Sequence, residues 1–264
     1  MNGVYEIVGS GKTEAGRAFV FSGISGYDKS TRSRFPEISG TVVSLGSMPR
    51  LKNYRPSKGE MVFDPPSGEL LYDPLKAYNP QMVTDILDLS QKEWDHNPFA
   101  VAGNGSQVLL VCDAMMNYIS VEEGPIKRDL KDYGDKYDNP RLFSISCVNI
   151  ISAEASVGVS GGYRNPRMLT ILHEDLAKGE ALTLSTLLDD SGKPYVPRSR
   201  VIRRAVEKIR LKGDSPSELA QMAFDLMCPE TAVCANVAVW SDEINAWELA
   251  TKSRYKLSQI IKGF

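Results

Sequence analysis

The chain has few of the side chains on which metal sites and covalent catalysis usually depend. Its 264 residues include only two histidines, His96 and His173, which stand in unrelated contexts. There are four cysteines and no Cys-x-x-Cys pair: Cys112, Cys147, Cys228 and Cys234. A zinc site needs three or four Cys, His or carboxylate ligands at a regular spacing. We therefore expect no metal and no cofactor, and we expect the cysteines at 112, 147 and 234, in apolar segments, to be buried thiols.

An excess of charge of one sign is also absent. Lys and Arg number 31 against 33 Asp and Glu, a net charge of −2, whereas nucleic-acid-binding domains are usually basic, with a pI above ~9. No segment reaches the ~18 uncharged apolar residues of a membrane span. The first residues lack a basic segment followed by an apolar one, so we expect no secretory signal. These absences predict a soluble, cytoplasmic protein that binds neither nucleic acid nor membrane.

The length suits one α+β domain over residues 1–264, since a chain of this size buries ~73% of its unfolded surface. β-rich apolar runs predict strands at Val4–Val8, Arg17–Ile24, Thr41–Leu45, Phe99–Ala102, Gln107–Cys112, Leu142–Ile151, Ala155–Val159, Met168–His173, Ala232–Trp240 and Ala246–Thr251. Residues 46–80 are expected to form loops, with a β-hairpin around Met61–Tyr72. We interpret Asn104-Gly105-Ser106 as the turn of another hairpin, because Asn-Gly between apolar runs favours one.

Helices are expected mainly near the C-terminus. Apolar residues recur with a period close to 3.6 over Arg200–Leu211. Ser215-Pro-Ser-Glu218 matches a capping box, with Pro at the first helical position, and predicts a helix that runs to about Met227. A further helical segment is expected within Glu122–Asp132. Strand pairs at both ends of the chain suggest sheets covered by helices on their outer faces.

Two glycine-rich segments invite a nucleotide-binding interpretation that their surroundings disfavour. Gly9-Ser-Gly-Lys-Thr13 resembles a phosphate-binding loop, but Glu6 stands where the first glycine of that motif belongs and a strand follows instead of a helix. We expect a hairpin turn there. Gly158-Val-Ser-Gly-Gly162 opens no clear helix and is expected to be a turn or a close backbone approach.

Three polar clusters are better candidates for a site. Ser30–Pro36 places two arginines in a hydroxyl-rich loop suited to an anionic oxygen. Ala77–Pro80 places a phenol and an amide before a turn, and Asn104–Ser106 supplies hydrogen-bond donors. The segment Tyr137–Arg141 recurs as Tyr163–Arg167, which is either a turn repeated by chance or an arginine aimed twice into a site. Each cluster taken alone is more typical of a solvated loop than of a site, so the prediction of a site depends on their order along the chain.

The order of these clusters resembles the archaeal-type inosine monophosphate (IMP) cyclohydrolase family. That family has a Ser-Arg-Ser-Phe-Pro loop, an Ala-Tyr-Asn element, an Asn-Gly-Ser element, an acidic segment ending in Thr-Pro-Arg-Ile, and Gly-Ser-Pro-Glu-Glu before Trp-Asn-Leu-Ala-Thr. The counterparts here are Ser30–Pro36, Ala77-Tyr78-Asn79, Asn104-Gly105-Ser106, Asp132–Leu142, Gly213–Glu218 and Trp247–Thr251. The likeness covers most of residues 3–251.

The chain departs from the family pattern at several positions. Arg34 is an extra residue, so either Arg32 or Arg34 holds the family's arginine position. Asn139 stands where the family has Thr, and either Asp135 or Asp138 replaces the family's glutamate. Residues 163–212 form a longer segment than in the archaeal proteins, an insertion atypical of the family.

The resemblance implies a four-layer αββα sandwich like that of the N-terminal nucleophile hydrolases. It also implies closure of the purine ring of 5-formamidoimidazole-4-carboxamide ribonucleotide to IMP, with release of water. Enzymes that use an N-terminal nucleophile expose Cys, Ser or Thr as their first residue, whereas Met1 is followed here by Asn2 and Gly3. The reaction needs no metal or histidine, and the implied partner is a purine nucleotide substrate.

The resemblance also implies roles for individual residues. Arg32, or Arg34 in its place, would stabilise the oxyanion and Tyr78 would donate or relay a proton. Asn104 would bind the base, and Asp138 or Asp135 would assist proton transfer. The implied substrate-binding residues are Arg34, Asn79, Gly105, Ser106, Asn139 and Arg141, with Arg141 and the Ser106 region as the candidates for the 5′-phosphate.

Two other classes of function remain open at this point. One is a nucleotide-binding protein that keeps the pocket without the chemistry. The other is an amide hydrolase of the same fold that uses Cys112 or Ser160 as its nucleophile. Enzymes of this size are usually homo-oligomers, and that is the expectation here.

Overall fold

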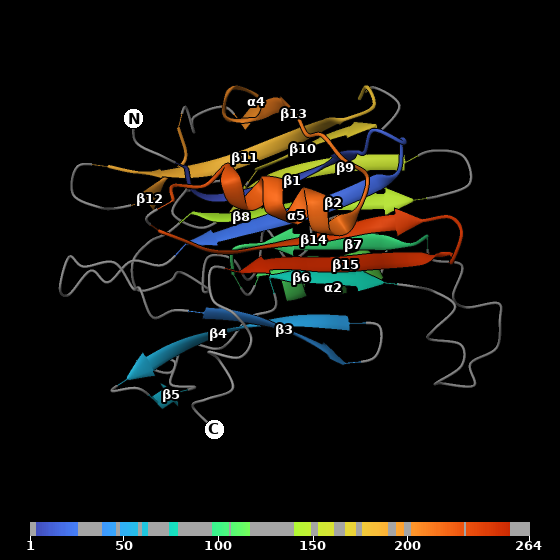
Figure 1. The fold of residues 1–264 in the computed structure, drawn as a ribbon. Helices are drawn as coiled ribbons and strands as arrows, with labels where there is room; N and C mark the ends of the chain where they lie inside the picture. Colours follow the sequence, from blue (N-terminus) through green and yellow to red (C-terminus); the bar gives the residue numbers. More distant parts are fainter. Residues whose placement is uncertain are drawn as a thin grey trace.

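The fold was examined in a computed structural model. It describes residues 4–25, 39–45, 48–57, 60–62, 74–78, 97–105, 107–116, 140–148, 153–160, 167–172, 176–189, 194–197, 202–229 and 231–253. The described part is a mixed α+β structure, built mostly from antiparallel sheets with few helices (Figure 1). The α+β class expected from the sequence is therefore confirmed.

The largest sheet has seven antiparallel strands and joins the two ends of the described chain. Its strands are β1 (Val4–Lys12), β2 (Ala18–Ser25), β11 (Glu180–Leu188), β12 (Pro194–Tyr195), β13 (Glu207–Arg210), β14 (Ala232–Ser241) and β15 (Ala246–Ser253). They follow the order β12-β11-β1-β2-β14-β15, with β13 also paired to β11. The predicted hairpins at both termini are confirmed. The expected insertion at 163–212 contributes β11, which pairs with β1 inside this sheet.

A second sheet of five antiparallel strands packs against the first. It contains β6 (Leu75–Tyr78), β7 (Phe99–Gly103), β8 (Arg141–Val148), β9 (Ala153–Ser160) and β10 (Arg167–Leu172), in the order β10-β9-β8-β7-β6. A third sheet, β3 (Ser39–Leu45), β4 (Met48–Ser57) and β5 (Glu60–Val62), lies beside the edge formed by β6 and β15 (Figure 1). Only β5 coincides with the hairpin expected at Met61–Tyr72, the rest of which lies outside the described residues.

Alternation along the strands shows which side of each sheet faces which neighbour. In β2, Phe19 and Phe21 pack under helix α5 (Pro216–Asp225), whereas Val20 packs against the second sheet. In β7, Val101 packs under helix α2 (Gln107–Met116), whereas Ala100 faces the first sheet. Among the described helices, α5 therefore packs on the outer face of the first sheet and α2 on that of the second, and the inner faces of the two sheets meet in the core (Figure 1).

Helix α5 begins as the sequence predicts. Ser215 is the N-cap and accepts a hydrogen bond from the Glu218 backbone N–H, while the Glu218 side chain accepts from the Ser215 backbone N–H. These contacts satisfy N–H groups that a helix start leaves unpaired. The backbone hydrogen bond from Ser215 and the Ser215 hydroxyl hold the pKa of the Glu218 carboxyl below its ordinary value of 4.5. The helix then buries Leu219, Ala220 and Ala223 on the first sheet.

Three predictions about local structure are wrong. Residues 46–80, expected to form loops apart from one hairpin, contain β4 and β6, because these segments pair with β3 and β7. Residues 107–112, expected to be a strand, form the first part of helix α2. The run lacks polar–apolar alternation, and it buries Val108, Val111 and Ala114 on one side, a helical spacing. The helix expected over Arg200–Leu211 is limited to α4 (Ile202–Ala205), because Glu207–Arg210 instead pairs with β11 as an edge strand. The helix expected within Glu122–Asp132 lies outside the described residues.

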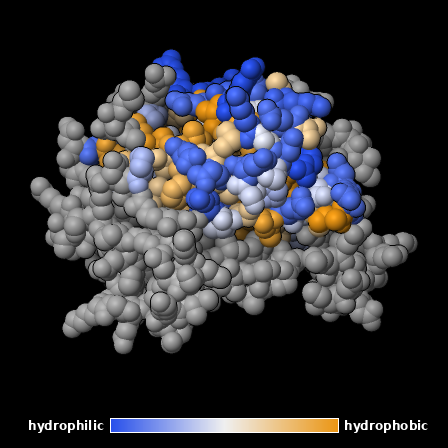
Figure 2. Space-filling view, in the orientation of Figure 1, coloured by the Kyte–Doolittle hydropathy of each residue, from blue (hydrophilic) through white to orange (hydrophobic). Residues whose placement is uncertain are grey.

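The surface over α5 carries no obvious apolar docking patch. Figure 2 shows hydrophilic residues interleaved with small hydrophobic areas on this face. The large apolar side chains that are exposed among the described residues come from three different elements: Tyr195, Leu226 and Ile244. Single exposed apolar residues are ordinary on soluble proteins. Among the described residues, no helix is both long and apolar enough to cross a membrane.

Candidate functional site

Asn104 lies where β7 leaves the second sheet and helix α2 begins. Its backbone N–H donates to the Leu142 carbonyl at 3.2 Å, one step beyond the last ladder pair, Gly103 with Phe143. Helix α2 then begins within a few residues, as the Val108 N–H donates to the Gly105 carbonyl. Asn104 is therefore held at a junction between a strand and a helix, and it is 3% exposed.

The Asn104 side chain uses all of its hydrogen-bonding capacity inside the protein. Its Nδ2 donates to Glu6 Oε2 at 2.7 Å and to the Pro140 carbonyl at 3.0 Å. Its Oδ1 accepts from the Leu142 backbone N–H at 2.7 Å and from Gln107 Nε2 at 3.0 Å. An amide offers two donors and two acceptor positions. The side chain of Asn104 thus organises the junction and has no group left over for a ligand.

Glu6 is a buried carboxylate that the sequence analysis did not select. It lies on β1 and is 8% exposed, and its backbone N–H donates to Thr186 Oγ1 on β11. Val8, two residues further along the same face of β1, packs with Leu142 of the other sheet. Glu6 therefore faces the space between the two sheets, where a charged group needs polar partners. Asn104, which lies 98 positions further along the chain, is one of these polar partners.

Gln107 is a second residue that the sequence analysis did not select. It is 1% exposed, and its Nε2 donates to Asn104 Oδ1 and, at 2.6 Å, to the Leu142 carbonyl. Its Oε1 is buried and accepts no hydrogen bond within the part of the chain that the structure describes. A buried acceptor without a donor is uncommon and often has a functional reason.

Gly105 and Arg141 complete the cluster. Arg141 begins β8, and its Nη1 donates to the Asn104 carbonyl at 3.3 Å. A Cβ built on Gly105 would lie 2.5 Å from Arg141 Nη1 and 2.5 Å from Gln107 Oε1. Only glycine lets both groups come this close to the backbone. Three predicted site residues, Asn104, Gly105 and Arg141, are therefore in direct proximity, and we refer to them with Glu6 and Gln107 as the Asn104 cluster.

Tyr78 lies elsewhere. It is 2% exposed on β6, and its ring stacks on Phe99 with centroids 5.2 Å apart. Tyr78 pairs with Phe99 at one end of β7, whereas Asn104 follows the other end, so about five residues or ~16 Å of strand separate them. The Tyr78 side chain also belongs to the group that packs on helix α2, the side of the sheet that faces away from Glu6. The structure does not bring Tyr78 to the Asn104 cluster.

The remaining predicted site residues lie outside the described residues: Arg32, Arg34, Asn79, Ser106, Asp135, Asp138 and Asn139. Of the two nucleophiles considered for a hydrolase, Cys112 is half-buried on α2 and packs against the core under that helix. Ser160 ends β9, and the strand register pairs it with Arg141. The four cysteines form no disulfide bond, and burial raises the pKa of Cys234 to about 12. No group of metal-ligating side chains occurs within the described ranges.

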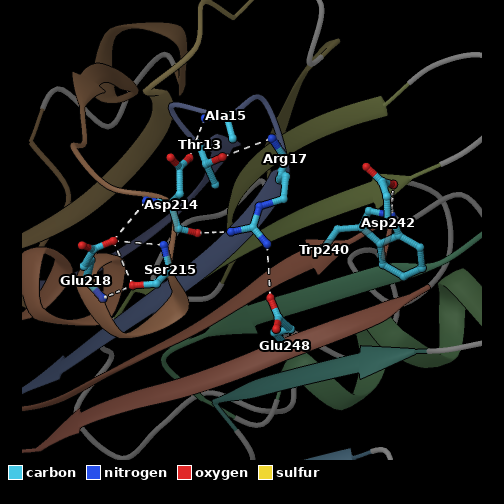
Figure 3. Close-up of polar contacts among 9 residues, drawn as sticks. All are labelled: Thr13, Ala15, Arg17, Asp214, Ser215, Glu218, Trp240, Asp242 and Glu248. Atoms are coloured by element: carbon cyan, nitrogen blue, oxygen red, sulfur yellow. Dashed lines mark hydrogen bonds and ion pairs between the residues drawn. The ribbon is translucent and has the colours of Figure 1, made fainter. Parts of the chain in front are cut away.

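A second polar cluster joins the β1–β2 turn to the start of α5 (Figure 3). Asp214 accepts from the Ala15 backbone N–H through its carboxylate and from the Arg17 guanidinium through its carbonyl. Arg17 also donates to Glu248 at 3.2 Å. Each of these groups is used in holding two surface segments together. Residues 9–12 of the glycine-rich motif considered above lie in β1 and pair with β2, and the turn begins at Thr13. The motif therefore belongs to the first strand of the hairpin and opens no helix that could bind a phosphate.

No protein-family model matches the chain, and a comparison with curated protein sequences finds no match. The candidate site therefore depends on its own geometry. That geometry is a buried carboxylate, two oriented amides and a guanidinium gathered at one junction between two packed sheets.

Proposed function

We propose that the chain is an IMP cyclohydrolase that closes the purine ring of 5-formamidoimidazole-4-carboxamide ribonucleotide. The observation that carries the proposal is the meeting of Asn104, Gly105 and Arg141 beside the buried Glu6. These three residues come from two separate segments that the family resemblance had marked as site segments. Their proximity is what a shared binding site requires.

The arrangement of the described elements supports the same proposal. We infer that α5, the seven-stranded sheet, the five-stranded sheet and α2 correspond to the layers of an αββα sandwich. Support comes from the alternating residues of β2 and β7, which divide between a helix and the opposite sheet. In such a sandwich, residues at the ends of the facing strands can converge on one site.

The proposed reaction is intramolecular. The carboxamide nitrogen attacks the formyl carbon, a C–N bond forms, and the nitrogen loses a proton while the formyl oxygen becomes the hydroxyl of a carbinolamine. That hydroxyl is then protonated and leaves as water, while the former formamido nitrogen forms a double bond to the same carbon and loses its proton. Much of the barrier to such a ring closure falls when the two groups are held in a near-attack geometry. The protein must also stabilise the oxyanion and transfer protons.

The residues divide among these tasks as follows. Arg32, or Arg34 in its place, stabilises the oxyanion, and Asp138 or Asp135 transfers protons. Arg141 binds substrate, and Asn104 holds Arg141 and Gln107 in position instead of contacting the base, because its side chain is fully hydrogen-bonded. Tyr78 stays in the proposal only as a packing residue, given its stacking on Phe99. The protein is proposed to act in the cytoplasm, as a homo-oligomer and without metal or cofactor.

The test is an ultraviolet assay for the purine product with purified protein and the formamido substrate. We expect turnover by the wild-type chain and at least a hundredfold loss on Arg32→Ala or Arg141→Ala, by analogy with the loss of one oxyanion donor. Arg17→Ala is the matched control, because Arg17 belongs to the surface cluster of Figure 3 and should leave turnover unchanged. Absence of turnover between pH 6 and 9 would refute the proposal.

The position of Tyr78 favours a second candidate, a nucleotide-binding protein without the chemistry. A phenol stacked in the core under α2 cannot relay a proton at the Asn104 cluster. Tight binding of IMP without turnover of the formamido substrate would identify this alternative.

A further inference from the structure

Backbone groups fix the orientation of both amides in the Asn104 cluster. The Leu142 N–H can only donate, so the atom of Asn104 that faces it must be the oxygen. The Pro140 and Leu142 carbonyls can only accept, so the atoms that face them must be Asn104 Nδ2 and Gln107 Nε2. The Gln107 Oε1 atom is consequently turned away from all of these partners.

This orientation leaves one acceptor of the cluster without a donor. Gln107 Oε1 is buried and accepts no hydrogen bond from the residues that the structure describes. Leaving such a group unpaired is unfavourable, and rotating the amide would instead break the two hydrogen bonds that Gln107 Nε2 donates. The hydrogen bonds of Asn104 and Gln107 therefore fix one another, and they leave Gln107 Oε1 able to accept from an N–H group outside the cluster.

A donor stands next to this acceptor. Arg141 Nη1 and Gln107 Oε1 both lie 2.5 Å from the Cβ position of Gly105, so they are at most about 5 Å apart. An N–H donor beside a C=O acceptor is the complement of an amide edge, whose C=O accepts and whose N–H donates. Paired recognition of this kind is the means by which Asn and Gln read the edge of adenine.

We propose that Gln107 and Arg141 bind the amide edge of the ligand: the carboxamide of the substrate and, after ring closure, the N1–H and C6=O of the hypoxanthine product. This inference rests on the proposed function and extends it by naming the specificity-determining residue, Gln107. It also assigns Arg141 to the base instead of the 5′-phosphate. The oxygens of a phosphate would meet the lone pairs of Gln107 Oε1, which repel them.

The first experiment uses the wild-type chain and isothermal titration calorimetry. The ligands are IMP and its N1-methyl derivative, in which a methyl group replaces the hydrogen that N1 would donate to Gln107. We expect the derivative to bind at least tenfold more weakly, the effect of leaving one buried acceptor unpaired. AMP, whose N1 is an acceptor, should bind as weakly as the derivative. Inosine and N1-methylinosine should show the same ratio, because the phosphate takes no part in this contact.

The second experiment asks whether Gln107 causes the discrimination. Gln107→Met removes the amide at similar volume. Gln221→Met is the matched control, because Gln221 is a half-buried residue of α5, remote from the cluster, whose Nε2 donates to Asp225. We expect Gln107→Met to reduce the ratio between IMP and the N1-methyl derivative to below twofold, and the control to retain it. A merely structural role for Gln107 would weaken both ligands equally and leave the ratio unchanged.

Each outcome separates this inference from the proposed function. Turnover with equal binding of IMP and its N1-methyl derivative overturns the inference and leaves the reaction intact. Discrimination without turnover supports the inference and refutes the reaction. Absence of any nucleotide binding overturns both. If Gln107→Met does not fold, equal or unequal binding of the two ligands by the wild-type chain still decides the inference.

Discussion

The substitution Asn104→Asp gives the sharpest test of how the candidate site is held together. It replaces Nδ2, which donates to Glu6 and to the Pro140 carbonyl, with an oxygen that donates only while it carries a proton. The hydrogen bond to a carboxylate is worth about 1.5–3 kcal/mol and the one to a carbonyl about 1 kcal/mol. We therefore expect the variant to lose about 1 kcal/mol of unfolding free energy where a shared proton preserves the contact with Glu6, and at least about 3 kcal/mol where both carboxylates are ionised. Asn104→Ser is the comparison that removes the contacts without adding a charge.

The pH dependence of Asn104→Asp separates this mechanism from ordinary loss of packing. Two buried carboxylates in contact cannot both be ionised at low cost, so the folded variant retains a proton that the unfolded chain releases above about pH 4. The folded state then binds one proton more than the unfolded state. Stability therefore falls as the pH rises, by about 1.4 kcal/mol per pH unit. This slope continues until the pH is high enough for the folded state to lose the shared proton as well.

The assay is urea denaturation between pH 5 and 8, followed by tryptophan fluorescence. Trp240 and Trp247 are suitable reporters, since each is 5% exposed and they pack edge to face with centroids 5.5 Å apart. Adding Glu6→Gln to Asn104→Asp should remove the pH slope and recover about 2 kcal/mol at pH 7, because the new amide can donate to the new carboxylate. A flat pH profile for Asn104→Asp, or a double variant no more stable than the single one, would refute the reasoning.

Four further predictions concern other parts of the fold. Ser215→Ala should lower the unfolding free energy by about 1 kcal/mol through loss of the helix cap, measured as a shift of the urea midpoint, and an unchanged midpoint would contradict the capping role. The hydrogen bonds from Ser215 lower the pKa of the Glu218 carboxyl, so the ionised carboxyl adds stability above pH 4.5 that is lost as the pH falls through the lower pKa of the folded state. The difference in melting temperature between the wild type and Glu218→Gln should therefore disappear in acid. Burial raises the pKa of Cys234 to about 12, so iodoacetamide at pH 8 should modify this thiol only after unfolding, as peptide mass spectrometry would reveal. Gly158→Ala should cost about 1–3 kcal/mol, because its Cβ would enter the ring of Phe143; wild-type stability would show that the ring can move aside.

The features that could be predicted from the sequence are those decided by nearby residues. The β1–β2 hairpin follows from two apolar runs around a polar turn, and α5 follows from the Ser215–Glu218 capping box. The β14–β15 hairpin is equally local. In each case the hydrogen bonds that define the element join residues close together in the chain. Contacts with distant residues are therefore not needed to determine these elements.

The wrong predictions arise where distant contacts decide the structure. Asn104-Gly105 is a common hairpin signal, but the Asn104 side chain bonds to β8 and to Glu6, and the next residues turn into a helix that covers the sheet. Residues 200–211 have apolar side chains at helical spacing, but Glu207–Arg210 forms a strand because its backbone can pair with the edge of β11. Neither β8 nor β11 is visible from the local pattern. For the same reason β11 itself was not predicted.

The two site residues that sequence analysis missed had a signal of a different kind. Glu6 is the one charged residue within the apolar run Val4–Val8, and Gln107 is the polar residue at the start of the apolar run that forms α2. On a strand buried on both faces, as β1 is over Tyr5–Gly11, a charged side chain has no solvent side to turn to. It must meet a polar partner from another element, since an unpaired buried charge is far too costly. A lone polar residue in a fully apolar run therefore indicates a long-range polar contact, although the sequence does not say with which residue. Here that contact is the hydrogen bond between Asn104 and Glu6, and it adds a third element to the cluster in which the backbone of Pro140 and Leu142 orients the amides on which the proposed ligand recognition depends.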